Sequence, residues 1–271
     1  GREFSFRLLG ALQPVNDGQR LLEVLEEASG QYVVEEIPEA LGYRFSHALF
    51  QESLSGQLSA VRRAQLHARI GEELEHLYGD GVEAHASELA YHYNGAGDLA
   101  GTEEKAVRYS LIAGEQALAA SANEEAIAHF QRGLAAKGNQ PVDDEAAALR
   151  FGLGRAQSAT LQRHELDQAY HTLSQAFEYY ASVGDLDRIV AVGEHPRSAF
   201  TETFTWLSPL TIRAMGLVPD GSNEMGRLLS SLGYFQGMEQ GDYKVSQQSF
   251  DRALAIAERD SDTALEMRAL A

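Results

Sequence analysis

Apolar residues recur over the first sixty positions with two different periods. Spacings of three and four residues, typical of an amphipathic helix, occur in FSFRLLGAL (residues 4–12) and QRLLEVLEEAS (residues 19–29). Two shorter runs, YVVEEI (32–37) and YRFS (43–46), are rich in β-branched and aromatic residues, and a turn sequence separates them. HALFQESLSGQL (47–58) returns to helical spacing. The pattern predicts two helices, a β-hairpin and a further helix.

A long amphipathic helix is predicted next. Ser59 is a residue type that caps helix N-termini, and Gly79 and Gly81 are suited to end the helix. One face of this helix carries Val61, Leu66, Ile70, Leu74 and Leu77.

From about residue 83 the strand pattern disappears, and helix-sized segments alternate with short polar breaks. One spacing of four residues recurs in this region. A small or aromatic residue is followed 12 positions later by a small residue, 4 positions after that by an aromatic residue, and 3 positions after that by another small residue. The two matching sets lie 120 residues apart, which is three periods of 40. The sets are Gly114, Ala126, Phe130 and Gly133, and Tyr234, Ser246, Phe250 and Ala253.

The spacing indicates pairs of antiparallel helices in close contact. Small residues allow two helices to approach, and a ring such as Phe130 fills the groove between them. Because one pair cannot bury its own apolar face, successive pairs are expected to stack into a solenoid. A longer variant places Gly154 against Ala169, Leu173 and Ala176, and a further pair is predicted in DLDRIVAVGEH and SPLTIRAMGLV.

These repeats resemble the tetratricopeptide repeat, with Ala126, Phe130 and the Gly241–Tyr243 turn as the closest matches. The period near 40 exceeds that family's usual one, and Ser246 and Tyr234 stand where small apolar residues are typical. The fold class expected is mainly α: a winged-helix-like N-terminal domain with a small β-hairpin, then a tetratricopeptide-like α-solenoid of antiparallel helix pairs.

The composition is that of a folded protein with an acidic surface. The 271 residues are 44% hydrophobic and carry a formal charge of −18, with a pI near 4.8. Such a surface repels nucleic acid, because duplex binding depends on neutralising phosphates. The chain has no cysteine and no apolar run long enough to span a bilayer. We therefore expect a cytoplasmic protein without membrane or direct nucleic-acid partners.

One local exception to the acidic surface is SAVRRAQLHAR, in which Arg62, Arg63 and Arg69 lie close together in the sequence. A solvated basic face that pairs with nearby carboxylates is one interpretation. A local phosphate contact is the other.

The stretch from Tyr43 to Gly79, together with GREFSFRLLGAL before it and EAHASELAYHYNGAGD and KAVRYSLIAGEQAL after it, resembles a known bacterial arrangement. It is similar to the region that follows the nucleotide-binding domain in large signal-transducing (STAND-class) ATPases, among them maltose-regulator-type transcription activators and ATPase-linked adenylate cyclases. The resemblance implies a winged helix over residues 1–58, linking helices over 59–104 and tetratricopeptide-like repeats over 105–271.

The resemblance also implies partners and cofactors. An effector protein, peptide or small molecule would bind in the solenoid groove, and an ATPase domain, absent from this sequence, would carry ATP or ADP and Mg²⁺. No G-x-x-x-x-G-K-[ST] loop occurs, so no cofactor and no ATP hydrolysis are expected of the sequence itself. The start at Gly1 and the end inside DTALEMRALA suggest a fragment of something longer.

His47 follows the predicted hairpin directly, at the start of the next helix. In the ATPase class a winged-helix histidine reaches the bound diphosphate, and the resemblance matches His47 to that residue. A helix start offers free N–H groups, and a neighbouring imidazole adds a donor for phosphate. The alternative is a histidine that caps its own helix or packs beneath the hairpin.

A second histidine motif is EAHASELAYHY, in which His85, Glu88 and His92 lie at i, i+3 and i+7 on one helical face. Zinc accepts such ligands. The spacing differs from H-E-x-x-H and no fourth ligand is evident, so a helix with two histidines at its packing seam is the simpler interpretation.

Aromatic residues gather in HPRSAFTETFTWLSPL, which contains Phe200, Phe204 and the only tryptophan, Trp206. They are candidates for an effector-binding patch on the solenoid, because such rings dominate contact energies. The alternative is that they fill an irregular joint between repeats. Tyr91, Tyr93 and Tyr109 are expected to be helix-packing residues.

Three functions are to be weighed. The first, which the resemblance implies, is a non-catalytic regulatory and sensor region of a signal-transducing ATPase. The second is a winged-helix DNA-binding regulator, which the scarcity of Arg and Lys in QRLLEVLEEAS opposes. The third is a metal-dependent enzyme built on His85, Glu88 and His92.

Overall fold

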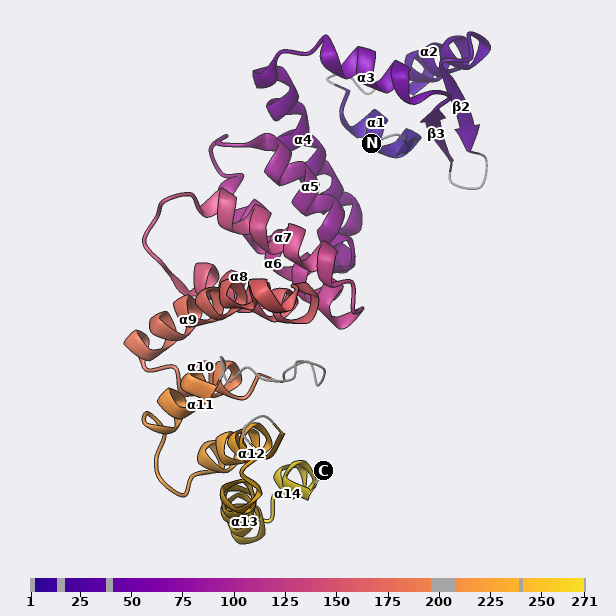
Figure 1. Ribbon diagram of the computed structural model, residues 1–271. Helices are drawn as coiled ribbons and strands as arrows, with labels where there is room; N and C mark the ends of the chain where they lie inside the picture. Colours follow the sequence, from indigo (N-terminus) through magenta and orange to yellow (C-terminus); the bar gives the residue numbers. More distant parts are fainter. Residues whose placement is uncertain (1–2, 14–17, 38–40, 196–207, 239–240, 271) are drawn as a thin grey trace. The chain divides into compact units, whose positions relative to one another are not determined.

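The computed structural model describes residues 3–13, 18–37, 41–195, 208–238 and 241–270 (Figure 1). The fold is mainly helical, with one small antiparallel sheet of three strands. The chain divides into two compact units, Gly1–Ile112 (unit 1) and Ala113–Ala271 (unit 2). The domain boundaries predicted at 58/59 and 104/105 stay predictions. Phe200, Phe204 and Trp206 lie outside the described residues.

The sheet of unit 1 has the strand order β1-β3-β2. The predicted hairpin is present as β2 (Val34–Ile37) and β3 (Gly42–Phe45). β1 (Glu3–Ser5) pairs with the other side of β3, so that Phe4 lies opposite Tyr43.

The start of FSFRLLGAL is therefore a strand, where the sequence pattern predicts a helix. The helix α1 begins only at Phe6, because the Ser5 hydroxyl caps it by accepting from the Leu8 N–H at 3.1 Å. Phe4 stays in the sheet, where its ring packs on those of Tyr43 and Phe45.

The remaining helices of unit 1 follow the sequence pattern. Ser59 caps the long helix as predicted, and Gly79, at φ +52°, ends it. Val61, expected on the apolar face, is 64% exposed, because the burial on this helix falls on its later turns, at Gly71 and Leu74. The helices are α1 (Phe6–Ala11), α2 (Gly18–Gly30), α3 (Ala48–Gly56), α4 (Ala60–Tyr78), the 3₁₀ segment η2 (Gly79–His85) and α5 (Ala86–Ala96).

The helices α4 and α5 pack as an antiparallel pair through reciprocal glycine contacts. A Cβ at Gly71 would come within 2.8 Å of the Tyr93 ring, and one at Gly95 within 2.6 Å of the His67 ring. The later residue of α4, Gly71, contacts the earlier residue of α5, Tyr93. The earlier residue of α4, His67, contacts the later one of α5, Gly95, so the two helices are antiparallel. Tyr93 and Tyr109 are buried as expected, whereas Tyr91 is 53% exposed.

Unit 2 continues this construction with consecutive helices side by side (Figure 1). The breaks after α7, α9 and α11 fall at the polar stretches KGNQPVDD, SVGDLD and VPDGSN. The helices are α6 (Glu103–Ala119, which crosses the unit boundary), α7 (Asn123–Lys137), α8 (Asp144–Thr160), η3 (Arg163–Glu165), α9 (Leu166–Val183), α10 (Leu186–Gly193), α11 (Ser208–Met215), α12 (Asn223–Met238), α13 (Tyr243–Asp260) and α14 (Thr263–Leu270).

The recurring sequence spacing corresponds to close helix contacts. A Cβ at Gly114 would lie 2.4 Å from the Phe130 ring and one at Gly154 would lie 2.5 Å from Leu173. Phe130 is fully buried. A Cβ at Gly152 of α8 would meet the same ring at 2.3 Å, so Phe130 is held between two glycines.

The C-terminal match is displaced by one residue. Gly233, not Tyr234, faces the Phe250 ring, while Tyr234 is 38% exposed. Ser246 lies against Gly237, and its hydroxyl donates to the Gly233 carbonyl at 2.7 Å. The Gly233–Phe250 and Gly237–Ser246 contacts run in opposite directions along the two helices, which makes α12 and α13 antiparallel.

Candidate functional site

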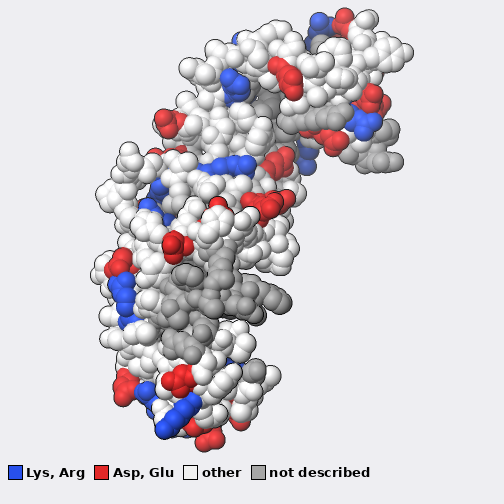
Figure 2. Space-filling view, in the orientation of Figure 1, with Lys and Arg blue, Asp and Glu red and all other residues white. Residues whose placement is uncertain are grey.

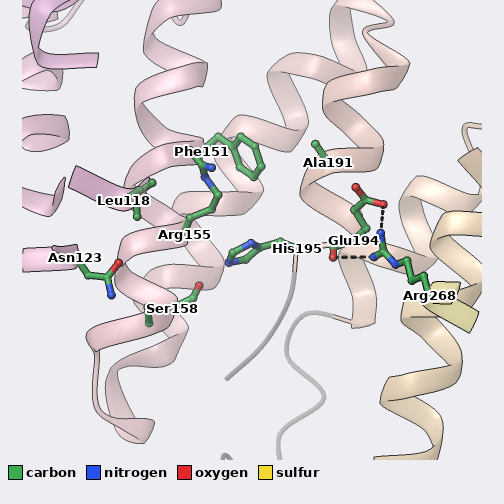
Figure 3. Close-up of a pocket in the computed structure, with 10 residues that line it drawn as sticks. Leu118, Asn123, Phe151, Arg155, Ser158, Ala191, Glu194, His195 and Arg268 are labelled. Atoms are coloured by element: carbon green, nitrogen blue, oxygen red, sulfur yellow. Dashed lines mark hydrogen bonds and ion pairs between the residues drawn. The ribbon is translucent and has the colours of Figure 1, made fainter. Parts of the chain in front are cut away.

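A cavity of about 860 Å³ lies within unit 2, among residues of α6, α7, α8, α10 and α14 (Figure 3). Its wall is part apolar, from Leu118, Phe151 and Ala191, and part polar. Three charged side chains, Arg155, Glu194 and Arg268, contribute to it together with His195.

Arg155 projects from α8 and lies over a ring of the same helix. Its guanidinium carbon is 4.8 Å from the centroid of Phe151, one turn earlier, which is a cation–π distance. An ion pair joins it to Glu115. Its Nε is buried and has no hydrogen-bond partner among the described residues, so the guanidinium keeps an unused donor.

His195 is the second residue after the end of α10, and Figure 3 shows its ring between Arg155 and the Glu194–Arg268 pair. Burial, with the nearby positive charge of Arg155 as a second cause, lowers the pKa of His195 to about 4. The ring is therefore neutral at pH 7. Its Nε2 is buried and makes no hydrogen bond with the described part of the chain.

Glu194 binds two arginines from different helices. The Nε of Arg227, in α12, donates to the carboxylate at 2.9 Å, and Nη1 of Arg268, in α14, does so at 2.9 Å. Nη2 of Arg268 also donates to the Ser231 hydroxyl at 2.9 Å. One carboxylate at the end of α10 thus connects α10 with α12 and α14.

These groups leave the cavity wall slightly positive. Of the charged side chains that line it, two are arginines (Arg155 and Arg268) and one is a carboxylate (Glu194). Arg227 does not line the cavity and interacts with Glu224 and Asp187 as well as with Glu194. The chain as a whole carries −18. In Figure 2, basic and acidic side chains are interspersed on the face shown.

His47 occupies the position that the sequence indicated, directly before α3. Its Nδ1 accepts the Leu49 N–H at 3.3 Å, so the histidine caps its own helix. An Nδ1 that accepts must be unprotonated, which places the proton of the neutral ring on Nε2. The ring is exposed, and its Nε2–H is a donor directed away from the cap.

The helix that His47 begins is itself exposed. No residue of α3 is buried, and Leu49, Phe50 and Leu54 are 64%, 41% and 50% exposed. Phe50 and Leu54 are four residues apart and share one helix face. An apolar helix face of this kind is typical of a surface that meets a partner.

The residues His85, Glu88 and His92 do not converge. His85 stacks on Tyr78 with ring centroids 3.6 Å apart, and Glu88 accepts the Tyr78 hydroxyl at 2.6 Å. His92 is buried and lies beside His67 instead. Within the described ranges, no group of three or more His, Cys, Asp or Glu side chains is placed to hold a metal ion.

The arginines of the basic stretch in α4 differ in their surroundings. Arg69 donates from Nη2 to the Leu12 carbonyl at 3.0 Å and so connects α4 to the segment after α1. Arg62 and Arg63 are exposed.

The sequence did not point to Arg155, Glu194, His195 or Arg268. Phe151 and Arg155 are four residues apart, which indicates a shared helix face, but Glu194, His195 and Arg268 lie 39 to 117 residues further along the chain. Only the packing of α8, α10 and α14 brings them together.

Comparison of the chain with models of protein families, with curated proteins and with solved structures finds no significant match. Of the helices that the structure describes, none combines the length and apolar character needed to cross a membrane.

Proposed function

We propose that this chain is a non-catalytic regulatory module that binds an effector and controls the nucleotide-binding domain of a signal-transducing ATPase. Residues 1–58 would form its winged-helix-like part, and the helix pairs would form its tetratricopeptide-like sensor. The order of elements supports this. Two helices and a hairpin come first, and a strand that precedes the first helix extends the hairpin to a three-stranded sheet. Pairs of helices that pack through small residues follow.

The observation that carries the proposal is the surface at the start of α3. An exposed imidazole with an outward Nε2–H stands beside exposed Leu49 and Phe50. The apolar side chains suit a protein partner, and the imidazole together with the helix N-terminus suits an anion such as a nucleotide phosphate. A nucleotide-binding domain supplies both.

The proposed mechanism is a two-state arm. An effector bound to the helix pairs would favour one arrangement of the module, and this would change how α3 and His47 contact the bound diphosphate. The effector can shift the equilibrium between the two states only by as much as its binding free energies for the two states differ.

Nucleotide release from the full-length protein tests the proposal. Removing a hydrogen bond to a charged phosphate weakens the contact by about tenfold or more, so His47→Ala is expected to speed ADP release without effector. His47→Ser is the matched variant, because serine restores the helix cap but not the ring. Faster release in both variants supports a ring contact, whereas unchanged release in the serine variant contradicts it.

The DNA-binding alternative is less well supported. The helix α2, which would have to enter the major groove, presents Glu23, Glu26 and Glu27 and a single arginine, Arg20, that pairs with Glu23 at 3.1 Å. Such a helix repels phosphates. Salt-sensitive binding to duplex DNA would reverse this preference.

A further inference from the structure

We propose that the cavity of unit 2 binds a small organic monoanion, a carboxylate with an apolar body, whose charged end is held at Arg268. The inference rests on the proposed function only in that this molecule would be the effector.

The size of the cavity favours a small molecule. A volume of about 860 Å³ falls within the range of roughly 300–1,000 Å³ typical of small-ligand pockets. A folded partner would need a wider contact surface.

The charge of the cavity wall favours a single negative charge. Glu194 already offsets one of the two arginines that bind it, and Glu115 offsets Arg155. Among the charged side chains that line the cavity itself, the two arginines, Arg155 and Arg268, outnumber the one carboxylate, Glu194, which leaves one formal positive charge in the lining. One carboxylate on the ligand would balance it, whereas a dianion would leave an excess negative charge.

Arg268 is the member of this cluster that lines the cavity. Its hydrogen bonds to Glu194 and Ser231 use Nη1 and Nη2, while a guanidinium has five N–H groups. It can therefore bind a second carboxylate without releasing Glu194. Its side chain is 37% exposed, so a ligand can reach it.

The rest of the wall suits an apolar body with few polar groups. Leu118, Phe151 and Ala191 provide the apolar surface. The neutral imidazole of His195 carries no charge that would oppose an apolar neighbour. Asn123 and Ser158, which also line the cavity, supply the few polar groups.

Calorimetric titration of the chain tests the proposal with matched probes. The probes are straight-chain carboxylates of graded length from acetate to octanoate, 3-phenylpropionate, its neutral amide, and phenyl phosphate. We expect one of the carboxylates with an apolar body to bind at about 1 mM or tighter, and its affinity to exceed that of the amide by about tenfold or more.

Three variants locate the site. Arg268→Gln is expected to remove the preference of 3-phenylpropionate over its amide, and Arg268→Lys to keep part of it. Ala191→Phe fills the cavity and is expected to weaken both probes. Arg213→Gln is the control, because Arg213 pairs with Glu178 at 2.7 Å and does not line the cavity.

Each other outcome overturns the proposal. Absence of binding for every carboxylate at about 1 mM excludes the ligand class. Tighter binding of phenyl phosphate excludes a monoanion, and an unchanged preference in a folded Arg268→Gln protein excludes the assigned residue. Because these titrations do not measure nucleotide release, the ligand assignment and the proposed regulatory role can fail separately.

Discussion

At the scale of single residues, Glu75 is where the polar contacts between α4 and α6 converge. Its carboxylate accepts from the Lys105 ammonium at 2.6 Å and from the Tyr109 hydroxyl at 2.7 Å. Burial acts to raise the pKa of Glu75, but the hydrogen bonds from Lys105 and Tyr109 outweigh it and hold the pKa below its usual 4.5. Burial, with the hydrogen bond to the Glu75 carboxylate as a smaller cause, raises the pKa of Tyr109 to about 12.

Replacing Glu75 by Gln is therefore expected to lower the free energy of unfolding at pH 7 by about 1–3 kcal/mol. The folded pKa lies below the unfolded one, so the carboxylate contributes fully above pH 4.5, and the contribution disappears as pH falls through the folded pKa. Urea unfolding measured from pH 7 to pH 3 should show the two proteins converging in acid.

Glu23→Gln is the matched control for that series. The Arg20–Glu23 pair is exposed, with side-chain exposures of 70% and 51%, and its loss should change stability by no more than about 0.5 kcal/mol. Equal effects of the two substitutions would contradict the role assigned to Glu75.

His92 gives a second prediction at this scale. Burial, with the neighbouring His67 as a smaller cause, lowers the pKa of His92 to about 4. The unfolded chain therefore binds a proton that the folded chain does not between pH 6.5 and about 4, and stability falls as pH falls across this window. The His92→Gln variant should show a shallower decline in urea midpoints over that window, and an unchanged slope would refute the assignment.

At the scale of elements, the glycine contacts determine how closely the helices approach. The Phe130 ring of α7 is enclosed by Gly114 of α6 and Gly152 of α8. A glycine inside a helix ordinarily costs about 1 kcal/mol relative to alanine. Its presence at these positions is explained by the space that the ring requires.

Gly152→Ala is accordingly expected to destabilise unit 2 by about 1–3 kcal/mol, because the added Cβ overlaps a fully buried ring. Gly10→Ala is the control: Gly10 is helical, and a Cβ added there would meet no neighbouring atom within 4 Å, so alanine should be neutral or stabilising. Chemical denaturation of Gly10→Ala, Gly152→Ala, Phe130→Leu and the Gly152→Ala/Phe130→Leu double variant measures the contact. The free energy of unfolding lost in the double variant should be smaller than the sum of the losses in its two single variants, because the smaller side chain leaves room for the added Cβ. A strictly additive result would argue against the overlap.

Much of the helix pattern could be predicted from the sequence, since apolar periodicity and caps such as Ser59 are local signals. The strand at Glu3–Ser5 could not, because pairing with β3 depends on residues forty positions away. The cavity in unit 2 depends on contacts of the same long-range kind. Tyr234 shows a further limit: a spacing pattern does not determine which of two adjacent residues faces the partner helix.

At the scale of the molecule, the division into two compact units predicts separable responses. Units with their own cores open with their own free energies. Hydrogen exchange should show that Glu75→Gln lowers protection mainly in α4 and in the part of α6 that belongs to unit 1, and that Gly152→Ala lowers it mainly in α7 and α8. Equal loss of protection in both units for either variant would show a single cooperative structure instead.

The Phe130 contact also constrains how this chain can diverge. Three positions, 114, 130 and 152, share one volume, so they are not free to change one at a time. Related sequences should show correlated substitution: where a smaller aliphatic residue replaces the phenylalanine, alanine or serine becomes acceptable at one of the glycines. Lineages that keep the aromatic ring should keep both glycines.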